Sequence, residues 1–221
     1  MSVFFLFFTF LLIQHILALE DHNDRKVLVI GASSGIGRAT ADIFSSRGAH
    51  VVYSSRRLSL LQEIVRDQPK SHAIQIDIES RDSLERGIDE ASTLLNGLDL
   101  VIYAPGYFGN DCFGTFEELF TSGNFSSGYT NSFKYHLEGM LQAFEHSRQH
   151  LIQSTRNRGG VFVTISSIAG SIGHNGSVLY AISKAAADAA IRQLALEYAT
   201  YPLRVLSVAP GEHFKTLMLF V

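Results

Sequence analysis

The sequence predicts an α/β protein built on a doubly wound parallel sheet. Six short apolar runs lie between Lys26 and Val208, and segments with helical spacing alternate with them. A glycine-rich turn separates the first run from the first helical segment. Alternating strands and helices are typical of a parallel sheet that carries helices on both faces. A chain of 221 residues with this pattern predicts a single domain.

The first strand is predicted over Lys26–Ile30, an apolar and β-branched run. The turn Gly31-Ala-Ser-Ser-Gly-Ile-Gly37 follows, and a helical segment then begins at Arg38 and ends near Gly48. Glycines let the backbone turn tightly and approach a pyrophosphate, whose charge lies at the helix N-terminus. The alternative is a glycine-rich turn that binds nothing. The predicted dinucleotide-binding residues are Gly31, Ser33, Ser34, Gly35, Ile36 and Gly37.

The second strand, His50–Tyr53, leads into Ser54-Ser-Arg-Arg57. In dinucleotide-binding folds an acid at this strand end binds the ribose 2′-hydroxyl of NAD, whereas an arginine accommodates the 2′-phosphate of NADP. Ser55 stands where the acid is expected, and Arg56 follows it. The sequence therefore favours NADP(H) over NAD(H), with Arg56 at the phosphate. Two solvated arginines on a loop are the alternative.

The remaining elements complete the alternation. Residues 112–129 are rich in Gly, Ser, Phe and Asn and predict a loop or a broken helix, either at a substrate entrance or as a surface insertion. The nearly unbroken apolar character of the fourth strand is expected when a parallel strand is covered on both faces. We predict strands over 73–76, 98–103, 160–165 and 203–208, and helices over 135–152 and 178–198.

Tyr180 and Lys184 lie four residues apart on the last helix, so their side chains share one face. A free tyrosine has a pKa of about 10, and a nearby ammonium favours the phenolate. Ser167 follows the fifth strand, thirteen residues before Tyr180, and its hydroxyl can bond a carbonyl or alcohol oxygen. These three side chains suit acid/base chemistry between a carbonyl and an alcohol. A Tyr-x-x-x-Lys pair alone is more often a solvated helix face.

The glycine turn, Ser167, Tyr180 and Lys184 together resemble the short-chain dehydrogenase/reductase family, of the classical type, from about Arg25 to the C-terminus. The resemblance implies a Rossmann-like fold, a nicotinamide cofactor, and hydride transfer to or from a carbonyl carbon without a metal. It implies that Tyr180 exchanges the proton, that Lys184 lowers its pKa and holds the nicotinamide ribose, and that Ser167 positions the substrate oxygen.

The resemblance assigns further residues, some of which depart from the family pattern. Asp77 and Ile78 would flank the adenine, although a plain strand-end aspartate is an equal alternative. The family carries Asn-Asn-Ala-Gly where this chain has Tyr103-Ala-Pro-Gly106, so only backbone contact through Ala104 and Gly106 remains. His136 stands where the family has the asparagine of its proton relay. Pro210 and Gly211 match the turn beside the nicotinamide, and Thr216 follows one residue late.

Composition excludes several function classes. A formal net charge of −3 without a basic stripe gives no case for nucleic acid. Cys112 is the single cysteine, so no intrachain disulfide can form. No cluster of Cys and His has the spacing of a metal site, and none is predicted.

The termini predict a membrane protein that is short at its C-terminal end. Residues 1–19 are apolar enough for an uncleaved membrane anchor or a signal peptide, residues 20–25 form a polar linker, and residues 26–221 form the catalytic domain. We expect association with the endoplasmic reticulum membrane, or a secreted or luminal protein if the segment is cleaved. The family's seventh strand and its substrate-covering segment are missing, and a homodimer is a further expectation from the resemblance.

The sequence therefore predicts an NADP(H)-dependent oxidoreductase that interconverts a carbonyl and an alcohol, with a small lipophilic substrate suggested by the membrane segment. The alternative is a catalytically impaired or inactive relative that binds nucleotide or a partner. Its support is His136, Tyr103-Ala104 in place of the asparagines, the late Thr216 and the short C-terminus.

Overall fold

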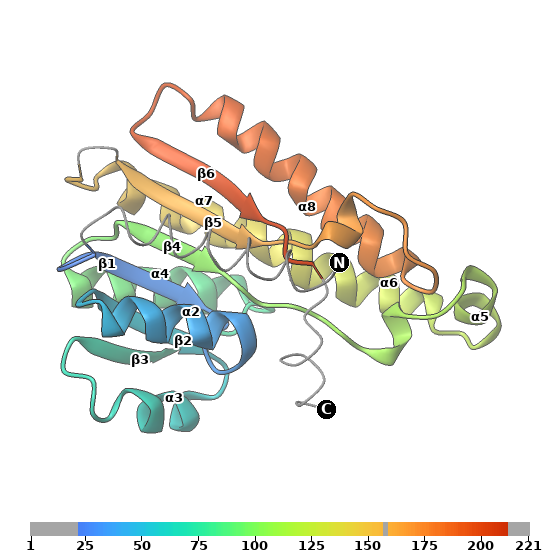
Figure 1. The fold of residues 1–221 in the computed structure, drawn as a ribbon, viewed down its shortest axis with the longest axis horizontal. Helices are drawn as coiled ribbons and strands as arrows, with labels where there is room; N and C mark the ends of the chain where they lie inside the picture. The colour runs from blue at the N-terminus through green and yellow to red at the C-terminus, as the bar shows by residue number, and fades with distance from the viewer. Residues whose placement is uncertain (1–21, 157–158, 212–221) are drawn as a thin grey trace, which may run out of the picture.

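The computed structural model describes residues 22–156 and 159–211. They form one sheet of six parallel strands in the order β3-β2-β1-β4-β5-β6 (Figure 1). This order, with the crossover between β3 and β4, confirms the predicted doubly wound α/β fold. The strands are β1 (Lys26–Ile30), β2 (His50–Ser55), β3 (Ser71–Gln75), β4 (Leu100–Tyr103), β5 (Gly160–Ile165) and β6 (Leu203–Val208).

Alternate side chains of each strand enter two separate apolar cores, as the pleat of a strand requires. On β1, Leu28 and Ile30 face the core that the later helices complete, whereas Val27 and Val29 face the other. The chain is apolar along β1 because both of its faces are covered. The helices are α2 (Gly35–Ser46), α3 (Leu58–Val65), α4 (Arg81–Leu95), α7 (Gly139–Ile152) and α8 (Val178–Glu197).

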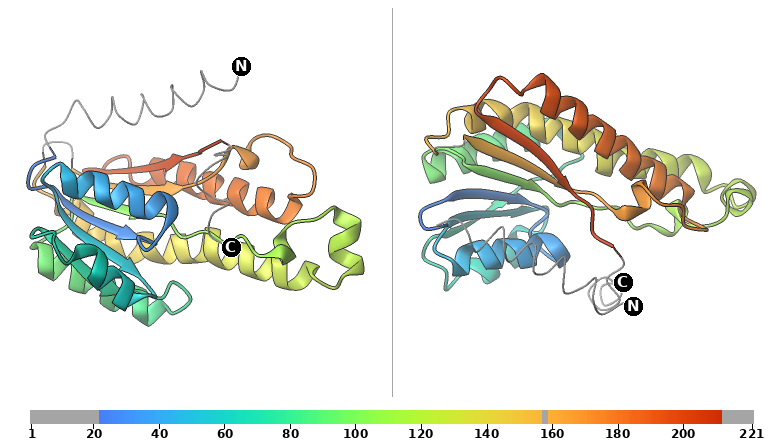
Figure 2. Two further views of the ribbon diagram at one scale, coloured as in Figure 1. Left: turned by 60° about the horizontal axis from the view of Figure 1, so that its bottom comes forward. Right: turned by 45° about the horizontal axis from the view of Figure 1, so that its top comes forward.

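The helices divide between the two faces of the sheet. Ile88 of α4, Phe144 of α7 and Ile191 of α8 pack in one core, and Phe44 of α2 and Leu61 of α3 pack in the other. Figures 1 and 2 show α7 and α8 running side by side on the same face. This arrangement leaves the carboxyl ends of the strands at one edge of the molecule, where ligands bind in doubly wound sheets.

Four strand boundaries differ from the prediction. The second strand ends at Ser55 rather than Tyr53, and the third ends at Gln75 rather than Ile76. The third strand begins at Ser71 rather than Ala73, because the backbone of Ser71 and His72 pairs with β2 although neither side chain is apolar. The fourth begins at Leu100 rather than Leu98. Asp99, just before it, uses its carboxylate to accept the Lys26 N–H at 3.0 Å, which ties the entry of β4 to that of β1.

Residues 112–129 form a broken helix rather than a loop. A short 3₁₀ turn (Asn110–Cys112) leads into the segment, which holds α5 (Phe116–Thr121) and the first part of α6 (Phe125–Phe133). A capping box between Thr115 and Glu118 starts α5. A π turn over Lys134–Glu138 then joins α6 to α7, so the helix predicted from Tyr135 begins inside a longer helical stretch.

Some predictions lie outside the described residues. These are the hydrophobic segment 1–19, the first two residues of the linker that follows it, and Thr216. Within residues 22–156 and 159–211, no helix is both long and apolar enough to cross a bilayer.

Candidate active site

A cleft of about 1010 Å³ opens at the carboxyl ends of the strands. The ends of β1, β2, β4 and β5 form its floor, and α8 forms one wall. Most of the predicted site therefore comes together, although its members are far apart in sequence. The predicted residues that line the cleft are Gly31, Ser33, Ser34, Gly35, Ile36, Gly37, Arg56, Ile78, Ala104, Gly106, Ser167, Tyr180, Lys184, Pro210 and Gly211.

Glycine occupies three positions of the turn after β1, and the steric surroundings differ at each. Gly31 has φ +87°, and a Cβ on it would lie 2.9 Å from the backbone nitrogen of Pro105. A Cβ on Gly37 would lie 2.3 Å from the carbonyl oxygen of Gly31, so only glycine allows α2 to start so close to β1. Gly35, with φ +56°, has nothing within 4 Å of its Cβ position, so this point of the turn faces open space.

The N-terminus of α2 points into this open space. Ser34 is its N-cap, but the serine side chain makes no capping hydrogen bond to the first turn. Amide N–H groups at an uncapped helix N-terminus, with the positive end of the helix dipole, form an anion site. Because Gly35 leaves room for a ligand at the same place, these residues fit the pyrophosphate of a dinucleotide.

The two arginines after β2 are oriented differently, and this was not predicted. Arg56 pairs with Glu79, with 3.0 Å between Nη1 and Oε1, although it also lines the cleft. Arg57 turns toward the glycine loop, where its Nη2 donates to Ser33 Oγ at 2.7 Å and to Ser34 Oγ at 3.3 Å. The guanidinium at the glycine loop therefore belongs to Arg57, which is one residue after the predicted Arg56.

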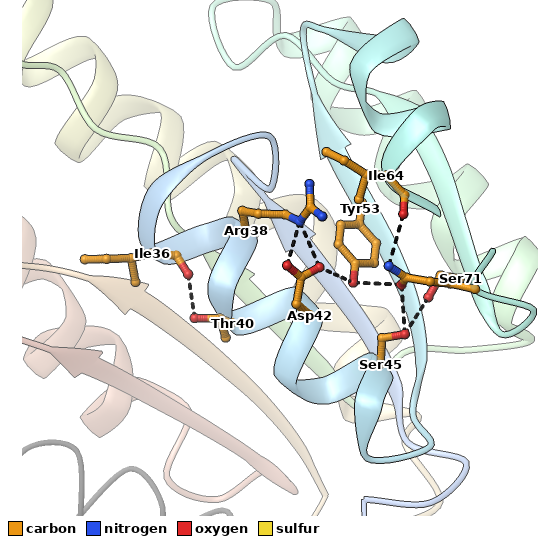
Figure 3. Close-up of polar contacts among 9 residues, drawn as sticks. Ile36, Arg38, Thr40, Asp42, Ser45, Tyr53, Ile64 and Ser71 are labelled. Atoms are coloured by element: carbon orange, nitrogen blue, oxygen red, sulfur yellow. Dashed lines mark hydrogen bonds and ion pairs between the residues drawn. The ribbon is translucent and has the colours of Figure 1, made fainter. Parts of the chain in front are cut away.

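A polar network fixes α2 against β2 and α3, behind the glycine loop (Figure 3). The buried Tyr53 hydroxyl donates to Asp42 Oδ1 and to Gln68 Oε1, at 3.0 Å each. Arg38 Nε donates to both oxygens of Asp42, and the Ser45 hydroxyl donates to Gln68 Oε1 at 2.9 Å. The network joins the helix that begins at the glycine loop to the strand that ends just before Arg56 and Arg57.

Tyr180 and Lys184 lie on the first two turns of α8 with their side chains on the cleft side. Lys184 Nζ donates to the carbonyl oxygen of Ile165 at 2.9 Å and lies 5.8 Å from the centre of the Tyr180 ring. Ser167 caps a 3₁₀ turn, with its Oγ accepting the Ala169 N–H at 3.2 Å. The last strand-to-helix connection therefore brings the serine to the tyrosine and the lysine.

Burial dominates the protonation of this group. It raises the pKa of Tyr180 above its ordinary value, while the Ser167 hydroxyl lowers it. Burial also lowers the pKa of Lys184 to about 8, against a smaller opposite effect of Asp188. The Lys184 ammonium bonds the backbone carbonyl of Ile165, and the lowering of the Tyr180 pKa by Lys184 stays a prediction.

His136 and Asp77 do not line the cleft. His136 lies in the π turn and is only 2% exposed, with both ring nitrogens in hydrogen bonds to protein groups. The Asp77 carboxylate accepts the Glu79 N–H at 3.1 Å and so belongs to the turn before α4, while its neighbours Ile76 and Ile78 face the cleft. A strand-end aspartate of this kind was the alternative interpretation.

Two aromatic side chains complete the wall around Tyr180, and sequence reasoning missed both. The ring centres of Phe108 and Phe113 lie 5.2 Å and 5.5 Å from that of Tyr180. Both phenylalanines line the cleft, and they are 51% and 38% exposed. Exposed aromatic side chains at a cleft could have been noticed as a signal, but their position next to Tyr180 depends on the fold.

Comparison with known proteins decides the family. A family model described as short chain dehydrogenase matches residues 25–219. The chain belongs to the short-chain dehydrogenase family. A 3-oxoacyl-(acyl-carrier-protein) reductase of Aquifex aeolicus is 29% identical over 189 residues, which cover 83% of this chain and 72% of that protein. A glucose 1-dehydrogenase of Gluconobacter oxydans is 32% identical over 193 residues, with 85% and 68% covered.

Solved structures show the same relationship. A short-chain dehydrogenase/reductase from Caenorhabditis elegans, solved with its cofactor, is 25% identical and has a TM-score of 0.73. The match covers 87% of this chain and 71% of that one. This short-chain dehydrogenase is therefore an oxidoreductase that acts on alcohols and carbonyls. A nicotinamide cofactor is typical of the family, and the open space over Gly35 and the uncapped start of α2 fit one.

Proposed function

We propose that this short-chain dehydrogenase interconverts a lipophilic carbonyl and an alcohol with NADP(H), and that Tyr180 exchanges the proton. The observation that carries the proposal is the position of the Tyr180 phenol, which shares one cleft with Ser167, Lys184 and the glycine loop. A bound nicotinamide supplies or accepts the hydride. The side chains of this chain supply the proton and orient the substrate oxygen.

In the direction of reduction, the raised pKa of Tyr180 keeps the phenol protonated near neutral pH. The phenol can then donate its proton to the substrate oxygen while Ser167 donates a hydrogen bond to the same atom. The Lys184 ammonium, which lies 5.8 Å from the centre of the Tyr180 ring, stabilises the phenolate that remains. In the direction of oxidation the same groups work in reverse, so deprotonation of Tyr180 at higher pH favours that direction.

The preference for NADP(H) rests on charge at the end of β2. Arg57 sits over the hydroxyls of Ser33 and Ser34, and Arg56 lines the same cleft. No acid of the described residues follows β2 directly, and the carboxylate of Glu79, which reaches this point from the turn after β3, is paired with Arg56. A guanidinium that already faces two hydroxyls can bind a phosphate in bidentate fashion.

Substitution of the two arginines tests the cofactor preference. Arg57→Ala should weaken NADPH binding by roughly tenfold to a hundredfold, because hydrogen bonds to charged groups contribute about 1.5–3 kcal/mol each. NADH binding should change little. Arg56→Ala should have a smaller effect, since that guanidinium also pairs with Glu79. Fluorescence titration measures both dissociation constants, and Arg47→Ala, at the far end of α2, is the control. Equal loss for both cofactors would reject the assignment.

A lipophilic substrate is supported by the wall around Tyr180. Phe108, Phe113 and the exposed Ile172 present apolar surface to the cleft next to the phenol. Steady-state oxidation of NADPH with a panel of lipophilic ketones and aldehydes tests this proposal. Phe113→Ser should raise KM for bulky apolar carbonyls more than for small polar ones. A uniform effect on all substrates would argue against an apolar substrate site.

We also propose that residues 1–19 attach the enzyme to the endoplasmic reticulum membrane and that the enzyme forms a homodimer. The support for the first proposal is the apolar sequence of the segment, and the support for the second is membership of the family. Secretion or a luminal location would follow if the segment were cleaved as a signal peptide. Carbonate extraction of membranes and light scattering of the detergent-solubilised protein test the two proposals separately.

A further inference from the structure

His136 occupies an unusual position directly behind the proposed proton donor. It lies in the π turn between α6 and α7, where backbone hydrogen bonds join residues five positions apart and the helix bulges. Its ring meets the Tyr180 ring edge-on, with 5.4 Å between the centres and 88° between the planes. The side chain is 2% exposed and does not line the cleft, so it reaches the active site only through other residues.

The hydrogen bonds of His136 fix its tautomer. The backbone N–H of Tyr107 can only donate, and it lies 3.0 Å from Nε2, so Nε2 carries no proton. The proton of the neutral ring is therefore on Nδ1, which donates to Ser183 Oγ at 2.8 Å. Ser183 in turn donates its own proton to the carbonyl oxygen of Tyr180 at 2.7 Å. In this series of hydrogen bonds, from the Tyr107 N–H through His136 and Ser183 to the Tyr180 carbonyl, each group therefore has a fixed role as donor or acceptor.

These hydrogen bonds connect three segments: the π turn that carries His136, the segment after β4, and helix α8. Tyr107 precedes Phe108, which packs on the Tyr180 ring from the segment after β4. Ser183 lies on α8 between Tyr180 and Lys184. The imidazole of His136 therefore holds the aromatic wall on one side and the helix turn of Tyr180 on the other.

We propose that His136 is a neutral positioning residue that sets the Tyr180 phenol against Phe108, and that it does not carry protons. The proposal rests on the function proposed above. A proton relay needs an imidazole that gains and loses a proton at solvent or at a water chain. A second proton on His136 would face the Tyr107 N–H, and the resulting donor–donor contact would break the bond that holds the wall.

The charged surroundings agree with this assignment. Burial, together with a smaller contribution from the Lys184 ammonium, lowers the pKa of His136 to about 2. The titratable groups that face the imidazole are Tyr180 and Lys184 from α8, and Tyr107 from the segment after β4. The Tyr107 phenol donates to Asp111 at 2.7 Å, so that carboxylate is engaged elsewhere. None of these groups favours an imidazolium.

Two amide substitutions separate the two bonds. Asn places a donor where Nδ1 lies, so His136→Asn should keep the bond to Ser183 and lose the bond to Tyr107. Gln places an acceptor where Nε2 lies, so His136→Gln should do the reverse. His136→Gln should lower kcat by roughly tenfold to a hundredfold, since a displacement of about 1 Å in a catalytic group can cost about 10²-fold. His136→Asn should chiefly raise KM, because Phe108 loses its support.

Controls separate positioning from loss of fold. His150→Gln removes a histidine from the other end of α7 that also bonds through both nitrogens, to Ser92 and Asp89, and should leave kcat unchanged. Ser183→Ala should lower kcat as His136→Gln does while NADPH still binds. If an amide variant fails to fold, Ser183→Ala alone decides: an unchanged kcat would overturn the proposal.

The pH dependence distinguishes positioning from a relay. The pH profiles of kcat should have the same shape in the wild type and in both amide variants. A limb with a pKa near 6–7 in the wild type that disappears in both variants would show proton transfer by His136 and overturn the proposal.

Nitrogen chemical shifts test the tautomer without turnover. The ¹⁵N resonances of His136 are identified because they are missing from the spectrum of His136→Asn. In the wild type they should show a neutral ring protonated at Nδ1 from pH 5 to 9. An imidazolium or the other tautomer would reject the proposal. Correct shifts in an enzyme that reduces no carbonyl would contradict the proposed function and leave the hydrogen-bond assignment intact.

Discussion

At the scale of single residues, burial in the site has a marked effect on Lys184, whose pKa it lowers. It is 5% exposed, and among the described residues its ammonium donates a hydrogen bond to a single group, the backbone carbonyl of Ile165. The ammonium is therefore kept in the cleft at a cost in stability, which is expected where binding of a ligand matters more than stability.

The lowered pKa of Lys184 predicts how stability depends on pH. The folded protein loses this proton near pH 8, whereas an unfolded lysine keeps it to about 10.4. Between these values the unfolded state holds more protons, so this residue makes the free energy of unfolding rise with pH. Relative to Lys184→Met, the wild type should gain roughly 2 kcal/mol between pH 7 and 9.5, at about 1.4 kcal/mol per pKa unit. Urea unfolding measures the difference, and a constant difference would contradict the prediction.

At the scale of elements, the packing of α2 against β2 depends on the buried hydroxyl of Tyr53. Tyr53→Phe removes two hydrogen bonds but leaves Asp42 with Arg38 and Gln68 with Ser45. The free energy of unfolding should therefore fall by about 1 kcal/mol, the usual net value of a buried hydrogen bond. Tyr201→Phe, at a side chain that is 51% exposed, is the matched control. Equal melting temperatures for the two variants would show that the network does not stabilise this unit.

The elements that sequence predicted well are those defined by local pattern. The run Lys26–Ile30, the glycine turn and α2 lie together in sequence, and local sterics at Gly31 and Gly37 dictate their geometry. The order of Ser167, Tyr180 and Lys184 predicted their convergence for the same reason, since one turn and one helix carry them.

Properties that depend on long-range contacts were not predictable. Whether Arg56 or Arg57 faces the glycine loop depends on Glu79, which lies after β3. The resemblance places His136 at the asparagine of the family's proton relay, and its sequence position gives no sign that Tyr107 and Ser183 occupy both nitrogens. The division of residues 112–133 into two helices depends on a capping box and on packing of Leu119 and Leu179.

At the scale of the whole molecule, two N-glycosylation sequons, at which an asparagine can carry a glycan in a secretory compartment, bear on the membrane attachment proposed above. Asn124-Phe-Ser126 lies at the start of α6, and Asn175-Gly-Ser177 lies beside His174, which lines the cleft. Asn175 is exposed, so a glycan there would stand at the entrance of the cleft. An active enzyme therefore requires a cytosolic domain or an unused sequon.

We predict that the full chain, made in the presence of endoplasmic reticulum membranes, acquires no glycan. Treatment with endoglycosidase H should leave its electrophoretic mobility unchanged, and Asn175→Gln should migrate like the wild type. A shift that Asn175→Gln abolishes would place the cleft in the lumen with a glycan at its entrance, and would contradict the prediction.

The central claim is that Tyr180 supplies the proton in carbonyl reduction. The most direct measurement is kcat for NADPH-dependent reduction of a lipophilic ketone by the wild type and by Tyr180→Phe, with the NADPH dissociation constant measured on the same samples. We predict that Tyr180→Phe binds NADPH with nearly unchanged affinity while kcat falls by about 10²-fold or more, the range of general acid catalysis. A Tyr180→Phe enzyme that keeps the wild-type kcat would contradict the account, as would a wild type that binds NADPH and reduces no carbonyl.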